Sequence, residues 1–114
     1  MAGEKCIFCQ IVAGEIPSKK VLESDKFLAF HDINPIAPIH ILIIPKSHYP
    51  RFDETPTDLF SEMAQFIKEV SQTVGITDYR LIVNNGPKGG QEIFHLHIHL
   101  VANPEGSLKW PKLA

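Results

Sequence analysis

A stretch near the end of the chain, Phe94-His-Leu-His-Ile-His-Leu-Val101, alternates imidazole and aliphatic side chains residue by residue. Successive side chains of a β-strand leave opposite faces of the sheet, so this alternation predicts a strand with three histidines on one face. Leu96, Ile98 and Leu100 share the other face, where they can pack into a core. The stretch therefore predicts a strand that is anchored by one face and presents chemistry on the other.

Strand geometry limits what these three histidines can do together. Residues two apart on a strand are separated by roughly 6.5 Å, which puts His95 and His99 about 13 Å apart. This separation is too large for both to bind one metal ion jointly with His97. We expect a division of labour instead, in which His97 faces a substrate and its neighbours tune or assist it.

Short apolar segments joined by polar links predict the rest of the fold. We expect a short helix over residues 7–13 and strands over residues 20–23, 27–31, 39–44, 79–84 and 94–101. Thr55 is expected to cap a long amphipathic helix, with Pro56 in its first turn, apolar residues at three- and four-residue intervals, and Gly75 at its C-terminal end. Strands that follow one another through short links, with the helices set apart, indicate an α+β fold with a mainly antiparallel sheet.

The composition excludes several classes of protein. With 114 residues, 44% hydrophobic and 21% charged, the chain fits one globular domain. A net charge of −2 argues against a general nucleic-acid binder, because phosphate backbones are held by an excess of Lys and Arg. No apolar signal region opens the chain and no run approaches the length of a bilayer crossing, so we expect a cytoplasmic protein without a membrane partner.

A glycine-rich loop precedes the histidine stretch and indicates a phosphate ligand. Gly86, Gly89 and Gly90 let backbone amides approach an anion closely. A histidine attacks phosphorus through a neutral ring nitrogen when an acceptor holds the proton of its other nitrogen. We therefore predict a covalent intermediate on His97, which water then opens. Neighbouring imidazoles and loop amides would stabilise the phosphate charge, and an outer histidine would protonate the leaving group.

Several motifs together resemble the histidine-triad (HIT) superfamily, and within it the Hint branch of nucleotide-binding phosphoramidases. They are Cys6-Ile-Phe-Cys9, Phe30-His-Asp-Ile-Asn-Pro-Ile-Ala-Pro-Ile-His40, Ile43-Ile-Pro-Lys-Ser-His48, Gly89-Gly-Gln91 and His95-Leu-His-Ile-His-Leu-Val101. The resemblance covers about residues 6–101, which we take as the core of a single domain over residues 1–114 with an irregular tail. It implies a homodimer, about five antiparallel strands per subunit, and hydrolysis of adenosine phosphoramidates through an adenylylated histidine.

The same resemblance implies a role for individual residues. The nucleophile falls on His97, and the supporting histidines are His40, His95 and His99. Asp32 falls at the ribose-binding carboxylate, and Asn84 at an amide on the phosphate or ribose side. The residues that fall on the apolar base pocket are Phe8, Ile11, Phe30, Ile33 and Leu42. Gly90 and Gln91 fall at the phosphate loop, where Glu92 departs from the serine that some members carry.

Both cysteines lie in one Cys-x-x-Cys pair, Cys6 and Cys9, which in a reducing compartment indicates a metal or redox pair. Such a pair is half of a tetrahedral zinc site. Related branches, including the hexose-phosphate uridylyltransferases, resemble this arrangement and suggest His48 and His95 as the remaining ligands. A zinc ion here would be structural and would pin the N-terminal helix, while catalysis would require no cofactor. The alternative is two reduced thiols on a helix.

Three other functions stay open. A dinucleoside polyphosphate hydrolase of the same superfamily is the nearest, although those relatives commonly end the motif with glutamine and this chain has His99. A zinc-dependent hydrolase would use His95 and His97 with His40 to activate metal-bound water. A nucleotide-binding interaction module would need no turnover. The leaving amine, the preference between adenine and guanine, and the role of Trp110 in the tail are left open.

Overall fold

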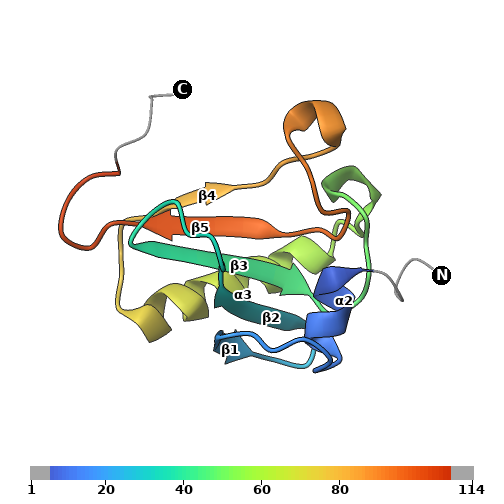
Figure 1. Ribbon diagram of the computed structural model, residues 1–114, viewed down its shortest axis with the longest axis horizontal. Helices are drawn as coiled ribbons and strands as arrows, with labels where there is room; N and C mark the ends of the chain where they lie inside the picture. Colours follow the sequence, from blue (N-terminus) through green and yellow to red (C-terminus); the bar gives the residue numbers. More distant parts are fainter. Residues whose placement is uncertain (1–5, 109–114) are drawn as a thin grey trace.

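A five-stranded antiparallel sheet forms the centre of the computed structural model, which describes residues 6–108 (Figure 1). The strands lie in the order β1-β2-β3-β5-β4. Their bounds are β1 (Lys20–Glu23), β2 (Phe27–His31), β3 (Ile39–Pro45), β4 (Arg80–Ile82) and β5 (Ile98–Ala102). Each neighbouring pair is antiparallel. This arrangement confirms the prediction of an α+β fold with about five antiparallel strands.

The two helices lie on opposite faces of the sheet (Figure 1). The long helix α3 (Leu59–Val74) covers one face, and the short helix α2 (Ile7–Val12) lies against the other. Two one-turn 3₁₀ helices, η1 (Phe52–Glu54) and η2 (Pro87–Gly89), lie in the loops. Both the long helix and the short N-terminal helix were predicted, and α3 ends as expected at Gly75, whose φ is +73°.

Alternation along the central strands divides the apolar side chains between two cores. Ala29, Ile41 and Ile43 face α3, together with Met63, Phe66, Ile67, Val70, Leu96 and Leu100. The intervening residues of β2 and β3 face α2, in a cluster of Phe8, Ile11, Leu28, Phe30, Leu42 and Ile44. Because β2 and β3 are buried on both faces, they form a rigid platform on which the polar residues of the α2 face stand.

The predicted cap of α3 was wrong. Thr55 adopts an extended conformation, and its hydroxyl donates to the Arg51 carbonyl at 2.8 Å, which closes the turn after η1. Residues 56–58 then form tight turns, in which the Leu59 amide donates to the Pro56 carbonyl. The helix therefore begins at Leu59 with Asp58 as its N-cap, without a side-chain hydrogen bond to the cap.

The histidine strand is shorter than predicted. Pairing with β3 starts where Ile98 faces Ile43, so β5 excludes His95 and His97. Continuing that register would put Leu96 opposite Pro45, which has no amide hydrogen to give to a sheet ladder. The Leu96 amide donates instead to the Tyr49 carbonyl at 2.7 Å. The predicted alternation of faces nevertheless holds, since Leu96 and Leu100 are fully buried beneath α3.

Across residues 6–108, no helix combines the length and the apolar character that a bilayer crossing requires. The question raised by Trp110 concerns a residue outside this described range.

Candidate functional site

A group of polar side chains stands on the face of the sheet that carries α2. His40 belongs to β3 and shares the parity of Leu42, while His99 of β5 lies directly opposite Leu42. The two imidazoles meet, with His40 Nε2 at 2.9 Å from His99 Nδ1. A carboxylate oxygen of Asp32, from the loop after β2, lies 3.4 Å from the same His40 Nε2. The strand register thus assembles Asp32, His40 and His99, which are far apart in sequence.

A backbone amide sets the proton positions in this group. The Ile36 N–H donates to His40 Nδ1 at 3.2 Å, so the neutral His40 ring carries its proton on Nε2. That proton is donated to His99 Nδ1, which leaves the proton of neutral His99 on its Nε2. Asp32, His40 and His99 offer three ligand atoms within 4.8 Å of one another. The protonated His40 Nε2 has no lone pair for a metal, so a hydrogen-bonded chain fits this trio better than an ion.

His97 lies beside this chain with one ring nitrogen free of hydrogen-bond partners among residues 6–108. Its Nδ1–H donates to the main-chain carbonyl of His95 at 2.7 Å, which fixes the neutral tautomer with the lone pair on Nε2. The ring packs edge-on against Phe8 at 5.1 Å and against His99 at 5.0 Å between centroids. Burial lowers the pKa of His97, partly opposed by the His95 carbonyl and by Asp32, so the ring is neutral at neutral pH. Such an imidazole can act as a nucleophile.

Burial also keeps the neighbouring imidazoles neutral. The pKa of His99 is lowered to about 4, first by burial and then by the positive charge that His97 and His40 carry when protonated. Burial lowers the pKa of His40 as well, against the opposing charge of Asp32. An anionic ligand in the site would favour protonation of these rings.

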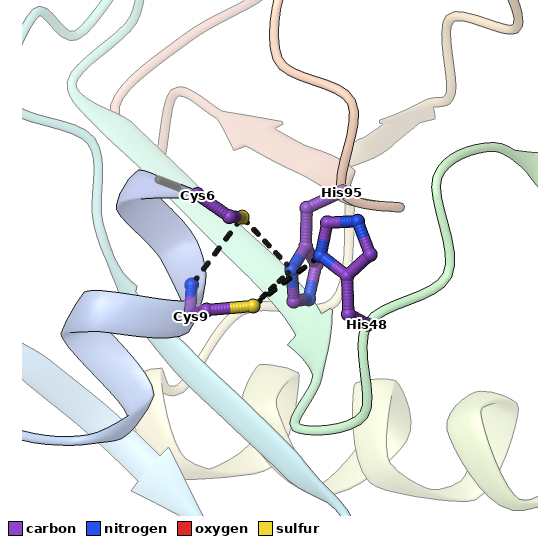
Figure 2. A group of neighbouring side chains, drawn as sticks. All are labelled: Cys6, Cys9, His48 and His95. Atoms are coloured by element: carbon purple, nitrogen blue, oxygen red, sulfur yellow. Dashed lines mark hydrogen bonds between the residues drawn. The ribbon is translucent and has the colours of Figure 1, made fainter. Parts of the chain in front are cut away.

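A second cluster joins Cys6 and Cys9 of the α2 end to His48 and His95, as Figure 2 shows. His95 Nδ1 lies 3.3 Å from Cys6 Sγ and 3.5 Å from Cys9 Sγ, and His48 Nδ1 lies 3.3 Å from Cys9 Sγ. The four ligand atoms all lie within 4.8 Å of one another. Residues that are 89 positions apart in the sequence are thus brought together.

The geometry of this cluster fits a tetrahedral zinc ion. Typical zinc–sulfur and zinc–nitrogen bonds imply tetrahedral S···N edges of roughly 3.6 Å, close to the distances found here. His95 donates its Nε2–H to the Pro45 carbonyl at 2.8 Å, so its Nδ1 lone pair is directed at the two sulfur atoms. Burial and the adjacent Cys6 raise the pKa of the Cys9 thiol to about 11, as expected for a thiol without a cation beside it.

Four of the five residues expected in the base pocket are buried in one cluster on this face: Phe8, Ile11, Phe30 and Leu42. Phe8 lies in the sequence between the two cysteines, and its ring contacts both His95 and His97. The fifth, Ile33, follows Asp32 in the loop and is 91% exposed. The loop therefore carries an unusually exposed apolar side chain next to the carboxylate.

The backbone amides of the glycine loop form hydrogen bonds within the loop. The amides of Gly89 and Gln91 donate to the Gly86 carbonyl, and the amide of Gly90 donates to the Pro87 carbonyl. The Gly86 amide donates to the side-chain oxygen of Gln91 at 2.9 Å. These four amides are therefore engaged within the turn, and a phosphate would need donors from elsewhere.

Asn84 is a side chain beside the turn that can supply a donor. It lies beside Gly90, where φ is +94° and a Cβ atom would be 3.7 Å from Asn84 Cγ. The exposed Glu92 makes none of the side-chain hydrogen bonds found among residues 6–108.

Two contacts that fix the tautomers of His40 and His97 come from the main chain: the Ile36 amide and the His95 carbonyl. Sequence reasoning missed both, because main-chain groups leave no signal in the residue types.

The class of protein is thus defined by one sheet that carries the hydrogen-bonded pair of neutral histidines, His40 and His99, on its central strands. Beside this pair lie His97, with a ring nitrogen that has no hydrogen-bond partner among residues 6–108, and the cysteine–histidine cluster. The family model named HIT domain matches residues 13–106, so the chain belongs to the HIT family. An uncharacterized HIT-like protein of Methanocaldococcus jannaschii is 48% identical over 107 residues, which cover 89% of this chain and 81% of the relative.

Two further comparisons carry names that describe an activity or a ligand. Adenylylsulfatase HINT3 of Arabidopsis thaliana is 40% identical over 109 residues, which cover 92% of this chain and 55% of that protein. The crystal structure of a histidine triad nucleotide-binding protein from Candida albicans superposes with a TM-score of 0.80 at 36% identity, covering 96% of this chain and 85% of that one. These matches agree with the fold described above.

The buried neutral state of His99 makes stability depend on pH. Since the pKa of His99 is about 4 in the folded chain and about 6.5 in an unfolded one, the unfolded chain binds more protons between these values. The contribution of His99 is therefore complete above about pH 6.5 and is lost as the pH falls toward 4. We expect the free energy of unfolding, measured with urea, to fall from pH 7 to pH 4.5, and to fall less in His99→Gln. An equal fall in both proteins would contradict this assignment.

Proposed function

We propose that the protein hydrolyses nucleoside phosphoramidates of the AMP–amine type by forming a nucleotidyl intermediate on His97. The observation that carries this proposal is the bond from His97 Nδ1–H to the His95 carbonyl, which leaves the Nε2 lone pair available for attack. HIT-family membership and the histidine triad nucleotide-binding neighbour support a nucleotide ligand.

The first chemical step is attack by His97 Nε2 on the α-phosphorus. The P–Nε2 bond forms, the P–N bond to the amine breaks, and the departing amine takes a proton from His99. The negative phosphate raises the pKa of the nearby imidazoles, so that His99 can carry this proton in the complex. In the ligand-free protein, His40 donates its Nε2–H to His99 Nδ1 at 2.9 Å and so orients the His99 ring. When His99 Nδ1 carries the additional proton, the Nε2–H of His40 would turn to the Asp32 carboxylate, which lies 3.4 Å away.

The second step returns His97 to its starting state. A water molecule attacks the α-phosphorus, the P–Nε2 bond breaks, and the proton of the water passes to the neutral His99. AMP leaves with the new oxygen. Formation and hydrolysis of the intermediate thus use the same pair of imidazoles in opposite roles.

The nucleotide would lie across the face that carries α2. The buried cluster of Phe8, Ile11, Phe30 and Leu42, together with exposed Ile33, supplies apolar contacts for a base. Asp32 is assigned to the ribose hydroxyls and Asn84 to the phosphate or ribose. Gly90 contributes its close backbone approach beside Asn84, and His95 supports catalysis through its carbonyl.

Other leaving groups remain in competition with an amine. The HINT3 relative is named for adenylylsulfate, although this chain spans about half of its length. The third histidine, His99, favours a phosphoramidase over a dinucleoside polyphosphate hydrolase. A zinc hydrolase that uses His95 and His97 together has little support, because His95 Nδ1 faces the cysteines while His97 Nδ1 is bound to a carbonyl. An interaction module would bind nucleotide without turnover.

Detection of the adenylylated His97 is the most direct test of this mechanism. After mixing with an adenosine phosphoramidate and quenching within milliseconds, mass spectrometry should find one added adenylyl group, mapped to His97. His97→Ala and His97→Gly should form no adduct and lose turnover by about 10³-fold or more, since the nucleophile is gone. The same assay with adenylylsulfate and a diadenosine polyphosphate ranks the leaving groups.

Two results would contradict the mechanism. Turnover without a trapped adduct that chelation abolishes in a folded protein would assign the chemistry to metal-bound water. Nucleotide binding without turnover of any of these substrates would favour the interaction module.

A structural zinc ion in the cluster of Cys6, Cys9, His48 and His95 accompanies this proposal. When bound, zinc would crosslink the α2 end to the loop after β3 and to the segment before β5, and it would take no part in the phosphate chemistry. The soft thiolate pair and the oriented His95 ring support zinc over harder cations.

Metal content and stability test this assignment. We expect about one zinc per chain by elemental analysis, and little in Cys9→Ser, whereas His31→Ala, which removes an exposed histidine outside the cluster, should retain the metal. Zinc at roughly 100 times its dissociation constant stabilises by about 2.7 kcal/mol, so chelation should lower the melting temperature of the wild type and of His31→Ala, but not that of Cys9→Ser. Equal zinc in both variants would contradict the ligand set.

A homodimer is the expected assembly, and β4 is the edge that best suits a second copy. Leu81 and Val83 are exposed there, whereas the opposite edge strand, β1, exposes Lys20 and Glu23. We expect Leu81→Lys to shift the protein toward monomer in sedimentation experiments, and Lys20→Ala to leave the dimer intact. A dimer unaffected by Leu81→Lys would exclude this edge.

The cytoplasmic location and the absence of nucleic-acid partners stay predictions of the sequence.

A further inference from the structure

His97 owes its position to something other than the sheet. The ladder of β5 begins at Ile98, so the stretch from Gln91 to His97 lacks strand hydrogen bonds to β3. Within residues 6–108, the one backbone bond that ties this stretch to the loop after β3 runs from the Leu96 amide to the Tyr49 carbonyl, at 2.7 Å. The side chain of His95 adds a second tie, since its Nε2–H donates to the Pro45 carbonyl at 2.8 Å, but the residues before His95 need a support of their own.

The buried side chain of Gln91 supplies this support. Its Nε2 donates to the Pro50 carbonyl at 2.7 Å and to the Ile93 carbonyl at 3.0 Å, while its Oε1 accepts from the Gly86 amide at 2.9 Å. Gln91 is only 5% exposed. Both of its donors are therefore used, and both point at main-chain carbonyls inside the protein.

These three bonds join three segments that the sheet does not connect. Pro50 belongs to the loop that carries His48, Gly86 opens the glycine turn, and Ile93 precedes His95 by two residues. Gly86 is itself closely covered, since a Cβ there would lie 3.1 Å from the Arg51 guanidinium. Gln91 is thus the point where the turn and the histidine segment are held against the loop of residues 48–51.

We propose that Gln91 is a positioning residue, which holds the His95–His97 segment and the glycine turn in place without contacting the nucleotide. This proposal rests on the assignment of His97 as the nucleophile. It also gives Gln91 a different role from that implied by the family resemblance, in which the residue lies at the phosphate loop as a ligand. The physical reason is that an amide whose two donors are already bound inside the protein has none to offer a phosphate.

Two substitutions separate positioning from ligand binding. Gln91→Glu keeps the acceptor for the Gly86 amide but replaces the nitrogen that carries both donors with one oxygen, which faces the Pro50 and Ile93 carbonyls. Gln91→Met keeps the length of the side chain and removes its polar atoms, which guards against a failure of the first variant to fold. Gln72→Glu and Gln72→Met make the same changes at an exposed glutamine of α3 and serve as controls.

The measurements are the single-turnover rate of His97 adenylylation, the dissociation constant for AMP, and the ¹⁵N spectrum of the histidines, which reports their tautomers. In Gln91→Glu we expect the adenylylation rate to fall about 10- to 100-fold, as a displacement of the nucleophile on the order of 1 Å would cause. The AMP dissociation constant should stay within about twofold of the wild-type value. The ¹⁵N spectrum should show a mixture of the two His97 tautomers in place of the Nδ1–H form alone. The Gln72 variants should match the wild type.

Two outcomes would overturn the proposal. Weaker AMP binding with an unchanged adenylylation rate at saturation would make Gln91 a ligand of the nucleotide. An unchanged rate and an unchanged His97 spectrum in folded variants would make it a structural residue without influence on the site. If the wild type forms no adduct at all, the proposed function fails, but the His97 spectrum of the variants still tests the positioning role separately.

Discussion

The short hydrogen bond from His97 to the main chain of His95 is the contact on which the rest of the site depends. It selects the tautomer that carries a lone pair on Nε2, the nitrogen without a hydrogen-bond partner among residues 6–108, and burial lowers the pKa of the ring so that it is uncharged at neutral pH. The roles proposed for the His40–His99 pair, the Asp32 carboxylate and the apolar cluster around Phe8 all depend on where His97 Nε2 lies. A ring rotated by half a turn would present a bound proton instead of a nucleophile.

One residue links the two clusters of the molecule. The side chain of His95 faces the cysteines, while its carbonyl holds His97, so the proposed metal site and the proposed nucleophile share a single backbone unit. Phe8 repeats this connection from the other side, because it lies between Cys6 and Cys9 and packs against His97. The cysteines therefore contact both the α2 end, which carries Phe8, and the segment that carries His97.

Much of this architecture follows from residue patterns. Alternation along the histidine stretch predicts its two faces, because successive side chains of a strand leave opposite sides of the sheet. The strands β2 and β3, which are buried on both faces, are predicted instead from short apolar runs between polar links. The approach of Cys6 and Cys9 to His48 and His95 was reached through a family resemblance, since spacing cannot bring together residues 89 positions apart. The sequence does not predict the late start of β5, because this start depends on which residue faces Pro45. The predicted cap at Thr55 was wrong because the Thr55 hydroxyl donates to the Arg51 carbonyl instead of capping α3. The glycine pattern predicts amides that bind an anion, whereas in the structure the amides of Gly86, Gly89 and Gly90 donate to acceptors within the turn itself.

The groups that set the proton positions of His40 and His97 are the Ile36 amide and the His95 carbonyl, and both belong to the peptide backbone. Every amino acid carries such a carbonyl, and every one except proline carries such an amide. Side chains at position 36 can therefore drift in size and polarity without moving a proton in the site. The proton position of His40 therefore tolerates most substitutions at residue 36, and proline is the replacement there that would remove the donor outright. Position 95 has no such freedom, because the side chain of His95 also contacts the two cysteines and the Pro45 carbonyl.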